Sequence, residues 1–217
     1  GRRSDGSSVF LPSPAGAVSG RFFGQSSFAS HALAHRSSVV KIRDDVPLEL
    51  MGPLGCGLQT GAGAVLNVLK PASGSSLAVF GVGAVGLAAV MAARIAGCER
   101  IVAVDLNPAR LQLAAELGAT HTLDAAAGRT VREIQKLSGG LGVHFSVECS
   151  GQPAVLVQAV RALRAGGSCA LLGMSAPDAE VSLNLMTLLN GRSVRGVMEG
   201  DSVPQTFIPQ LIEWWRA

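Results

Sequence analysis

From Ser76 to the end of the chain, short runs of β-forming residues alternate with segments long enough to be helices. This alternation is typical of a parallel sheet whose strands are joined by helical crossovers and covered by helices on both faces. The runs are mostly apolar, as expected of strands buried on both sides. The sequence predicts six strands: Leu77–Phe80, Ile101–Val104, Thr120–Leu123, Val143–Glu148, Ser168–Leu172 and Ser193–Val197.

Helix signals lie between these strands. The clearest helix is Pro108–Leu117, which Asn107 can cap and Gly118 can end in a left-handed conformation. Similar signals predict helices over Ala84–Ala96, Val131–Leu137, Pro153–Leu163 and Pro204–Trp215, with glycine pairs at 139–140 and 166–167 closing two of them. The expected fold class is therefore α/β, with a doubly wound parallel sheet of the Rossmann type.

Composition excludes several classes of protein. Of the 217 residues, 48% are hydrophobic and 15% charged, so the chain has the means to form a core. A net charge of +3 without a basic block longer than Arg2-Arg3 argues against a nucleic-acid partner. The four scattered cysteines and the lack of a signal-peptide pattern favour the cytoplasm. The uncharged stretch Pro71–Ala93 suggests a membrane span, but its glycines fit a strand-to-helix turn better.

The first 50 residues differ from the rest. They are richer in serine and β-forming residues, and Arg21–Ala34 and Ser38–Ile42 are predicted to be strands. An uncharged segment, Met51–Leu69, is expected to be a connecting helix. We therefore predict three parts: residues 1–50 from one unit, a connecting segment at 51–70, and the sheet domain at 71–217.

A glycine motif follows the first predicted strand directly, in the order Gly81-Val82-Gly83-Ala84-Val85-Gly86. In a dinucleotide-binding turn, Gly81 permits the tight bend, and Gly83 leaves no side chain between the backbone and a diphosphate. Gly86 lets the following helix approach the strand. The free N–H groups at the start of that helix favour a diphosphate. Taken alone, the motif also fits a plain buried turn.

An acidic residue supports the cofactor interpretation. Asp105 lies nineteen residues after Gly86 and ends the second strand run, where a carboxylate can accept both ribose hydroxyls of an adenosine. A 2′-phosphate would meet like charge there, so NAD is expected rather than NADP. Arg110 lies within reach of the ribose or a phosphate, although an arginine on a helix surface is often only solvated. The simpler alternative is that Asp105 starts a loop.

Beyond this point the residues alone do not define a reaction, but several passages resemble a known family. The chain is similar to the zinc-dependent medium-chain alcohol dehydrogenases, and within them to the aryl-alcohol (benzyl-alcohol) dehydrogenases. The resemblance runs from about Phe22 to Trp215. It rests on FFGQSSFASHAL, GPLGCGLQTGAGAVLNVL, VDLNPARLQLAAELGATHTLD, VECSG and GVMEGDSVPQTFIPQLIEWW.

The resemblance implies transfer of hydride from a zinc-bound primary alcohol, aromatic or otherwise apolar, to NAD, giving an aldehyde. It makes Cys56 one of three protein ligands of the zinc and places Thr60 beside the nicotinamide. Val85 would pack behind the nicotinamide ring, with Leu172 and Gly173 along its edge. It also implies that residues 1–50 are the remnant of a GroES-like catalytic domain, and that Ser193–Val197 pairs across a homo-oligomer.

The sequence also departs from the family. The family takes a Cys and a His ligand, and its proton relay, from a segment before the position of Gly1, and it carries a four-cysteine structural zinc lobe. None of these is in the sequence, nor are the family's last strand and helix. Because a catalytic zinc needs three protein ligands, we expect a fragment that binds dinucleotide, with turnover only in an intact parent.

Other interpretations stay open. A zinc-free quinone or enone reductase would share the fold, although Asp105 and Cys56 argue against it, and a non-catalytic dinucleotide-binding module is a third possibility. From the residues alone, Cys56 is more simply a small buried hydrophobe. His31 and His35 are expected to be surface or core imidazoles rather than metal ligands. Packing roles are expected for the remaining cysteines, Cys98, Cys149 and Cys169, and Glu148 is left without a role.

Overall fold

The structure is a computed structural model that describes residue 7 and residues 30–217. These residues belong to two units, Gly1–Arg43 and Asp44–Ala217. In the first unit, the described part holds the 3-10 helix η2 (Arg36–Ser38), whose start is capped by the His35 side chain. The strand predicted over Ser38–Ile42 is wrong: residues 39–43 form no regular structure and pair with no strand of the described residues. The other predicted strand, Arg21–Ala34, lies almost entirely outside the described residues.

The second unit is an α/β domain around a six-stranded sheet. All its strand pairs are parallel, in the order β3-β2-β1-β4-β5-β6. The strands are β1 (Ser76–Phe80), β2 (Arg100–Asp105), β3 (His121–Asp124), β4 (Val143–Glu148), β5 (Leu163–Leu171) and β6 (Ser193–Gly196). This confirms the predicted Rossmann-type sheet. The strand order reverses between β1 and β4, which is where open α/β sheets bind ligands.

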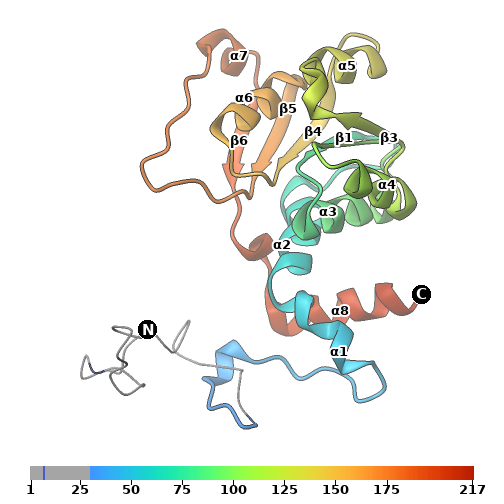
Figure 1. Ribbon diagram of the computed structural model, residues 1–217, viewed down its shortest axis with the longest axis vertical. Coiled ribbons are helices and arrows are strands. Elements are labelled where there is room, and N and C mark those ends of the chain that lie inside the picture. The colour runs from blue at the N-terminus through green and yellow to red at the C-terminus, as the bar shows by residue number, and fades with distance from the viewer. Residues whose placement is uncertain (1–6, 8–29) are drawn as a thin grey trace. The chain divides into compact units, whose positions relative to one another are not determined.

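Helices cover both faces of the sheet (Figure 1). The helices after β1 are α3 (Ala84–Ile95), α4 (Pro108–Leu117), α5 (Thr130–Leu137), α6 (Pro153–Arg161), α7 (Leu185–Leu189) and α8 (Pro204–Arg216), with the 3-10 turns η5 (Ala125–Ala127) and η6 (Glu199–Asp201). Alternate residues of β1 point to opposite faces: Leu77 and Val79 join the core under α3 and α4, whereas Ala78 and Phe80 join the core under α5 and α6. The doubly buried strand is thus confirmed.

The connecting segment is less regular than predicted. In place of one helix over Met51–Leu69, the chain forms α1 (Leu48–Met51), the 3-10 turn η3 (Gly52–Gly55), α2 (Gly57–Gly63) and the π-helix η4 (Ala64–Leu69). Cys56 interrupts the series with a non-helical backbone (φ −144°, ψ −78°). Proline and glycine in η3 favour such a break because they lower helix propensity.

The predicted strand and helix bounds are otherwise close. The largest difference is β5, which begins at Leu163 instead of Ser168, so the glycine pair 166–167 lies inside the strand. The pairing with β4 shifts register between Val143 and Phe145, which is the mark of a β-bulge, and Gly166 supplies its positive φ of 72°. The predicted helix over Pro153–Leu163 accordingly ends at Arg161.

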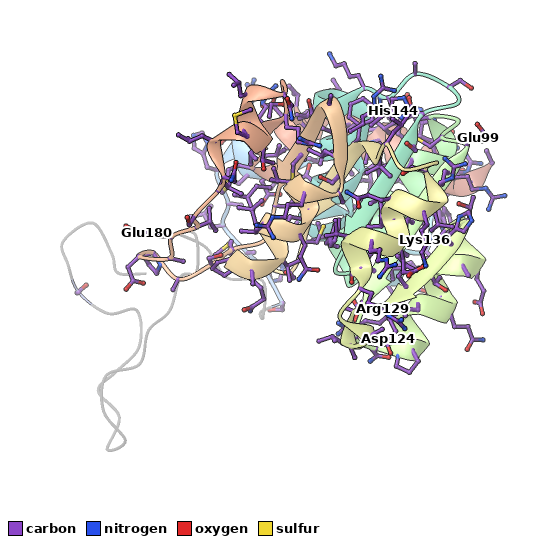
Figure 2. The ribbon with its side chains drawn as sticks, turned by 90° about the horizontal axis from the view of Figure 1, so that it is seen from above. Glu99, Asp124, Arg129, Lys136, His144 and Glu180 are labelled. Atoms are coloured by element: carbon purple, nitrogen blue, oxygen red, sulfur yellow. The ribbon has the colours of Figure 1, made fainter. Side chains whose placement is uncertain are left out.

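Two exposed regions lie at the periphery of the sheet domain. The segment between β5 and α7, which carries Glu180, extends away from the sheet, while Asp124, Arg129 and Lys136 lie on the side of β3 and α5 (Figure 2). At the edge of the sheet, every residue of β6 is exposed. None of the described helices combines the length and apolar character needed to cross a membrane.

Candidate functional site

The glycine turn lies where β1 passes into α3. Gly81 has a φ of 86°, which disfavours any other residue. A Cβ atom on Gly86 would lie 2.0 Å from the carbonyl oxygen of Gly81, so only glycine lets the helix pack this closely. Gly83 is different because a Cβ atom there would meet nothing within 4 Å. The absence of a side chain at Gly83 therefore leaves open space outside the turn.

That open space faces the start of a long helix. No side chain of the described residues caps α3, and the first backbone bond of the helix runs from Leu87 N–H to Gly83 O at 2.8 Å. The N–H groups of the first turn are therefore available, and the helix dipole adds partial positive charge at the same place. Such a helix start suits an anion such as a diphosphate.

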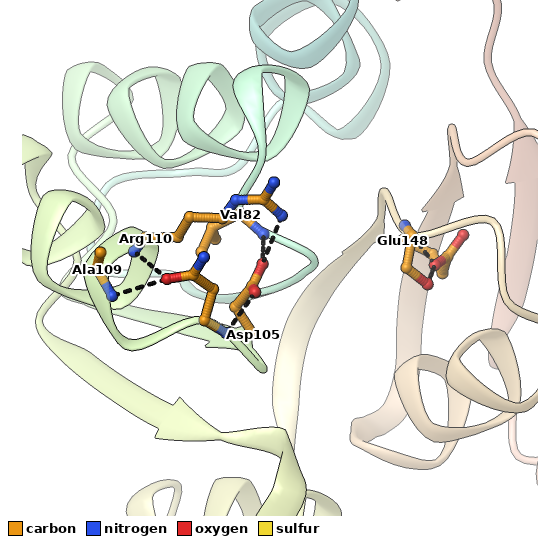
Figure 3. A network of polar contacts seen from close by, with 7 residues as sticks. Val82, Asp105, Ala109, Arg110 and Glu148 are labelled. Carbon is orange, nitrogen blue, oxygen red and sulfur yellow. Dashed lines mark hydrogen bonds and ion pairs between the residues drawn. The ribbon is translucent and has the colours of Figure 1, made fainter.

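Asp105 ends β2 beside this turn (Figure 3). Its Oδ2 accepts a hydrogen bond from Val82 N–H in the turn at 2.8 Å, and its Oδ1 accepts from Asn107 N–H at 2.9 Å. The residue is 9% exposed, and Arg110 Nη1 lies 4.0 Å from Oδ2. Each carboxylate oxygen thus keeps acceptor capacity for a further hydroxyl while backbone donors fix its position.

A cavity of about 500 Å³ joins these residues at the carboxyl ends of the strands. Of the predicted cofactor residues, Gly81, Gly83, Asp105 and Arg110 line it. The other walls come from β1, β2, the loop after β4, η5 and α6: Phe80, Val104, Leu106, Ala125, Cys149, Ser150, Gln152, Val155 and Gln158. The cavity lies at the reversal of strand order, as a dinucleotide site on such a sheet should.

Three further residues predicted to contact the cofactor do not line this cavity. Val85 is partly buried in α3, where its carbonyl oxygen would be only 2.0 Å from a Cβ atom on Gly61 of α2. Leu172 and Gly173 follow β5, and their N–H groups donate to the carbonyl oxygen of Glu148 at 2.9 and 3.0 Å. They therefore lie at the same edge of the sheet, with their predicted nicotinamide contacts still to be tested.

Glu148, which sequence reasoning left without a role, organises the loop after β4. Its side chain is fully buried and accepts hydrogen bonds from the N–H and hydroxyl groups of Ser150 and from Gly151 N–H. This loop touches the glycine turn, because a Cβ atom on Gly81 would lie 3.2 Å from Ser150 N. Glu148 thus fixes one wall of the cavity from within.

A second group of side chains gathers at α2. Cys56, the predicted zinc ligand, is exposed, which excludes the buried-hydrophobe interpretation. Its Sγ donates to Oε1 of Glu199 at 3.6 Å, and the Thr60 hydroxyl donates to Oε2 of Glu199 at 3.4 Å. Partial burial of its sulfur, and then the charge and hydrogen bond of Glu199, raise the pKa of the Cys56 thiol above its ordinary value. The thiol therefore stays protonated unless a cation is bound near it.

Sequence reasoning missed Glu199. It lies in η6 after β6, inside the VMEGDSVPQTFIPQL passage that carries the family resemblance, but nothing local indicates that it faces α2. Thiol and carboxylate are both zinc-binding groups, but two donors do not complete a catalytic zinc site, which needs three protein ligands. Within the part of the chain that the structure describes, no third metal-binding side chain joins them.

The remaining cysteines and histidines behave differently. Burial raises the pKa of the Cys98 and Cys169 thiols to about 11, and it also raises that of Cys149. Such thiols are poor nucleophiles, as a packing role predicts. His31 and His35 are exposed and hydrogen-bond to neighbouring serines.

Comparison with known proteins identifies the family of the chain. Residues 84–216 match the family model described as "Zinc-binding dehydrogenase". The chain belongs to this family. The match covers α3 to α8 and so includes most of the sheet, Asp105 and Glu199, which confirms the resemblance read from the sequence.

Named relatives of this zinc-binding dehydrogenase include a geraniol dehydrogenase from Castellaniella defragrans, 46% identical over 218 aligned residues. A solved alcohol dehydrogenase zinc-binding domain protein from Burkholderia ambifaria is 49% identical, with a TM-score of 0.91 over the whole chain. Benzyl alcohol dehydrogenase from Acinetobacter calcoaceticus is 41% identical, with a TM-score of 0.88 over 94% of the chain. The chain spans 57–58% of the length of these three proteins.

Proposed function

We propose that this chain is the cofactor-binding core of an NAD-dependent, zinc-dependent alcohol dehydrogenase that oxidises a primary, apolar or aromatic alcohol to an aldehyde. The observation that carries the proposal is the pair formed by the glycine turn and Asp105, joined by the 2.8 Å bond from Val82 N–H. The substrate class is supported by the names of two relatives, which act on geraniol and benzyl alcohol. Both of these are apolar primary alcohols.

In this proposal the cofactor lies along the carboxyl edge of the sheet. The N–H groups at the start of α3 bind its diphosphate, and Gly83 leaves room for it. Asp105 accepts the ribose hydroxyls, and its negative charge repels the 2′-phosphate of NADP. Thr60 and Val85 lie on the nicotinamide side, with Leu172 and Gly173 near the carboxamide. Bound NAD supplies the hydride acceptor.

Zinc would be held by Cys56 together with ligands from outside this chain. When bound, it supplies Lewis-acid chemistry that makes an alcohol more acidic. This chain would contribute one thiolate, that of Cys56, from the start of α2, which packs against α3. The Cys56 thiol donates its hydrogen bond to Glu199 in the structure.

The assignments around the site follow from the same proposal. Residues 1–50 would belong to a GroES-like catalytic domain, residues 51–70 would connect it to the NAD-binding domain, and residues 71–217 would form that domain. The exposed strand β6 would pair with its counterpart in a homo-oligomer, which would cover its free edge. The substrate partner is a small alcohol or aldehyde, and the expected location is the cytoplasm.

Calorimetric titration of the chain with NAD and with NADP tests the proposal. We expect NAD to bind more tightly, and Asp105→Ala to lower the ratio of the NAD affinity to the NADP affinity by at least about tenfold. Asp124→Ala is the matched control, because Asp124 is paired with Asp105 in register at the end of the neighbouring strand but does not line the cavity. An unchanged affinity ratio in Asp105→Ala would remove Asp105 from the cofactor site.

A further inference from the structure

Glu148 carries a buried carboxylate that the proposed function does not use. It ends β4, as Asp105 ends β2, at the edge of the sheet where the cofactor cavity lies (Figure 3). Its side chain is fully buried, and none of the ion pairs among the described residues includes it. Burying a carboxylate costs free energy unless hydrogen-bond donors take the place of water around it. The groups that donate to Glu148 therefore decide what it can do.

The carboxylate takes its hydrogen bonds from the loop after β4. Its Oε1 accepts from Ser150 N–H at 2.7 Å, from the Ser150 hydroxyl, and from Gly151 N–H at 3.1 Å. Its Oε2 accepts a longer bond from Gly151 N–H, at 3.3 Å. Cys149, Ser150 and Gln152 of this loop line the cavity. Glu148 therefore sets the shape of the cavity wall next to the glycine turn.

Glu148 also holds the loop after β5. Its backbone carbonyl oxygen accepts hydrogen bonds from Leu172 N–H at 2.9 Å and from Gly173 N–H at 3.0 Å. A Cβ atom on Gly173 would lie 2.6 Å from Oε2 of Glu148 and 2.1 Å from the nitrogen of Gly151, so the backbone of Gly173 packs directly on the carboxylate and on the loop after β4. The two loops therefore meet at Glu148.

We propose that Glu148 is a positioning residue for the cofactor, which holds the loops after β4 and β5 against each other so that the adenosine side and the nicotinamide side of the site form together. This inference rests on the proposed function, because it assumes NAD in the cavity with Leu172 and Gly173 beside its nicotinamide. The buried side chain acts through the two loops and does not touch the cofactor. Loops that are ordered before binding spare the cofactor the entropy cost of ordering them.

Two variants at position 148 separate the hydrogen bonds of the side chain from its charge. Glu148→Ala removes the acceptor and leaves three donors of the loop unpaired. In Glu148→Gln, the amide oxygen can take the place of Oε1, which receives three of the four bonds, so glutamine should keep the loops in place. By calorimetry we expect Glu148→Ala to bind NAD at least about tenfold more weakly and Glu148→Gln to lose less than about threefold. If the two variants lose equally, the hydrogen bonds do not carry the effect and the inference is wrong.

Titration with ADP-ribose, which lacks the nicotinamide ring, distinguishes an effect on one loop from an effect on both. Release of the loop after β4 should weaken the binding of ADP-ribose as well as that of NAD. Release of Leu172 and Gly173 should weaken NAD further, because these residues are expected beside the nicotinamide. We therefore expect Glu148→Ala to lower the ratio of NAD affinity to ADP-ribose affinity by at least about threefold. An unchanged ratio would mean that Glu148 orders the first loop alone, against the inference.

Hydrogen exchange of the chain without cofactor gives an independent readout. The amides of Gly151, Leu172 and Gly173 all donate to Glu148. If Glu148 holds the two loops together, Glu148→Ala should speed amide exchange in peptides from both loops, as mass spectrometry measures. Faster exchange in the loop after β4 alone would refute the link between the loops.

Val147→Ala is the matched control for a loss of stability. Val147 precedes Glu148 in β4, is fully buried in the core under α3 and α4, and does not line the cavity. Its truncation should lower the unfolding midpoint and leave both affinities unchanged at temperatures where the chain is folded. If Val147→Ala weakens NAD binding as much as Glu148→Ala does, the role of Glu148 is only structural and the inference is refuted.

The unmodified chain distinguishes this inference from the proposed function. If the unmodified chain binds NAD and Glu148→Ala binds it equally well, the cofactor site stands and only the role of Glu148 is refuted. If the unmodified chain binds no NAD, the proposed function fails, and the inference about Glu148 fails with it.

Discussion

Gly83→Val should separate cofactor binding from folding. Gly83 has φ −73° and ψ −165°, which an L residue with a branched side chain adopts without strain. A Cβ atom there has no neighbour within 4 Å. We therefore expect the free energy of unfolding to change by no more than about 0.5 kcal/mol. For a chain of this size, that corresponds to a shift of about 1–2 °C in the unfolding midpoint.

The same valine should strongly weaken NAD binding. Its side chain would fill the space in front of the first turn of α3, where the diphosphate is expected. If two charge-assisted hydrogen bonds from backbone N–H groups are lost, each worth about 1.5–3 kcal/mol, the cost is about 3–6 kcal/mol. This cost lowers NAD affinity by a factor of about 10² to 10⁴.

Calorimetry measures the affinity, and a thermal melt of the same samples measures the stability. Gly196→Val is the matched control, because Gly196 also has open space around it but lies at the end of β6, away from the cavity. If Gly83→Val keeps its unfolding midpoint and binds NAD as the unmodified chain does, the diphosphate does not lie at this turn, and the reasoning is refuted.

Gly86→Ala should lower stability by about 1–3 kcal/mol, seen as a lower midpoint in urea, because its methyl group would overlap the carbonyl oxygen of Gly81; an unchanged midpoint would contradict the packing argument. Iodoacetamide at pH 8 should modify Cys56 before the other three cysteines, because Cys56 is exposed and the others are buried or partly buried; mass spectrometry of digests measures the order, and earlier modification of a buried cysteine would contradict it. Burial, and then the charge of Arg164, lower the pKa of His144, so protonation favours the unfolded chain. Stability should therefore fall as pH drops through about 6.5, the ordinary pKa of histidine, and His144→Gln should flatten that dependence in urea melts.

Local sequence predicted the parts of the fold that depend on local interactions. The helix Pro108–Leu117 has the predicted bounds because its cap, Asn107, does accept bonds from Ala109 and Arg110 N–H. The glycine pair 166–167 was misread as a helix stop, because a glycine with positive φ serves a β-bulge as well as a helix end. The register of the neighbouring strand decides between the two, and a single segment does not contain that information.

The same distinction applies to the site. Only one helix and one strand separate the glycine turn from Asp105 in the sequence. This short spacing is why the sequence predicted that the two lie side by side in the fold. Glu199 contacts Cys56 only because the chain turns back toward α2 after β6, which is the strand at the edge of the sheet. That approach depends on close contact between Gly63 and Gly200, which no pattern near either residue indicates.

The tight packing of α2 restricts motion within the sheet domain. On one side Gly61 lies against Val85 of α3, and on the other Gly63 lies against Gly200, with no room for a methyl group at either contact. Sliding or rolling of α2 would cause backbone collisions on both sides, so α2, the start of α3 and the turn after β6 are expected to move as one rigid unit. Cys56 at the start of α2 and the glycine turn before α3 therefore keep a fixed separation.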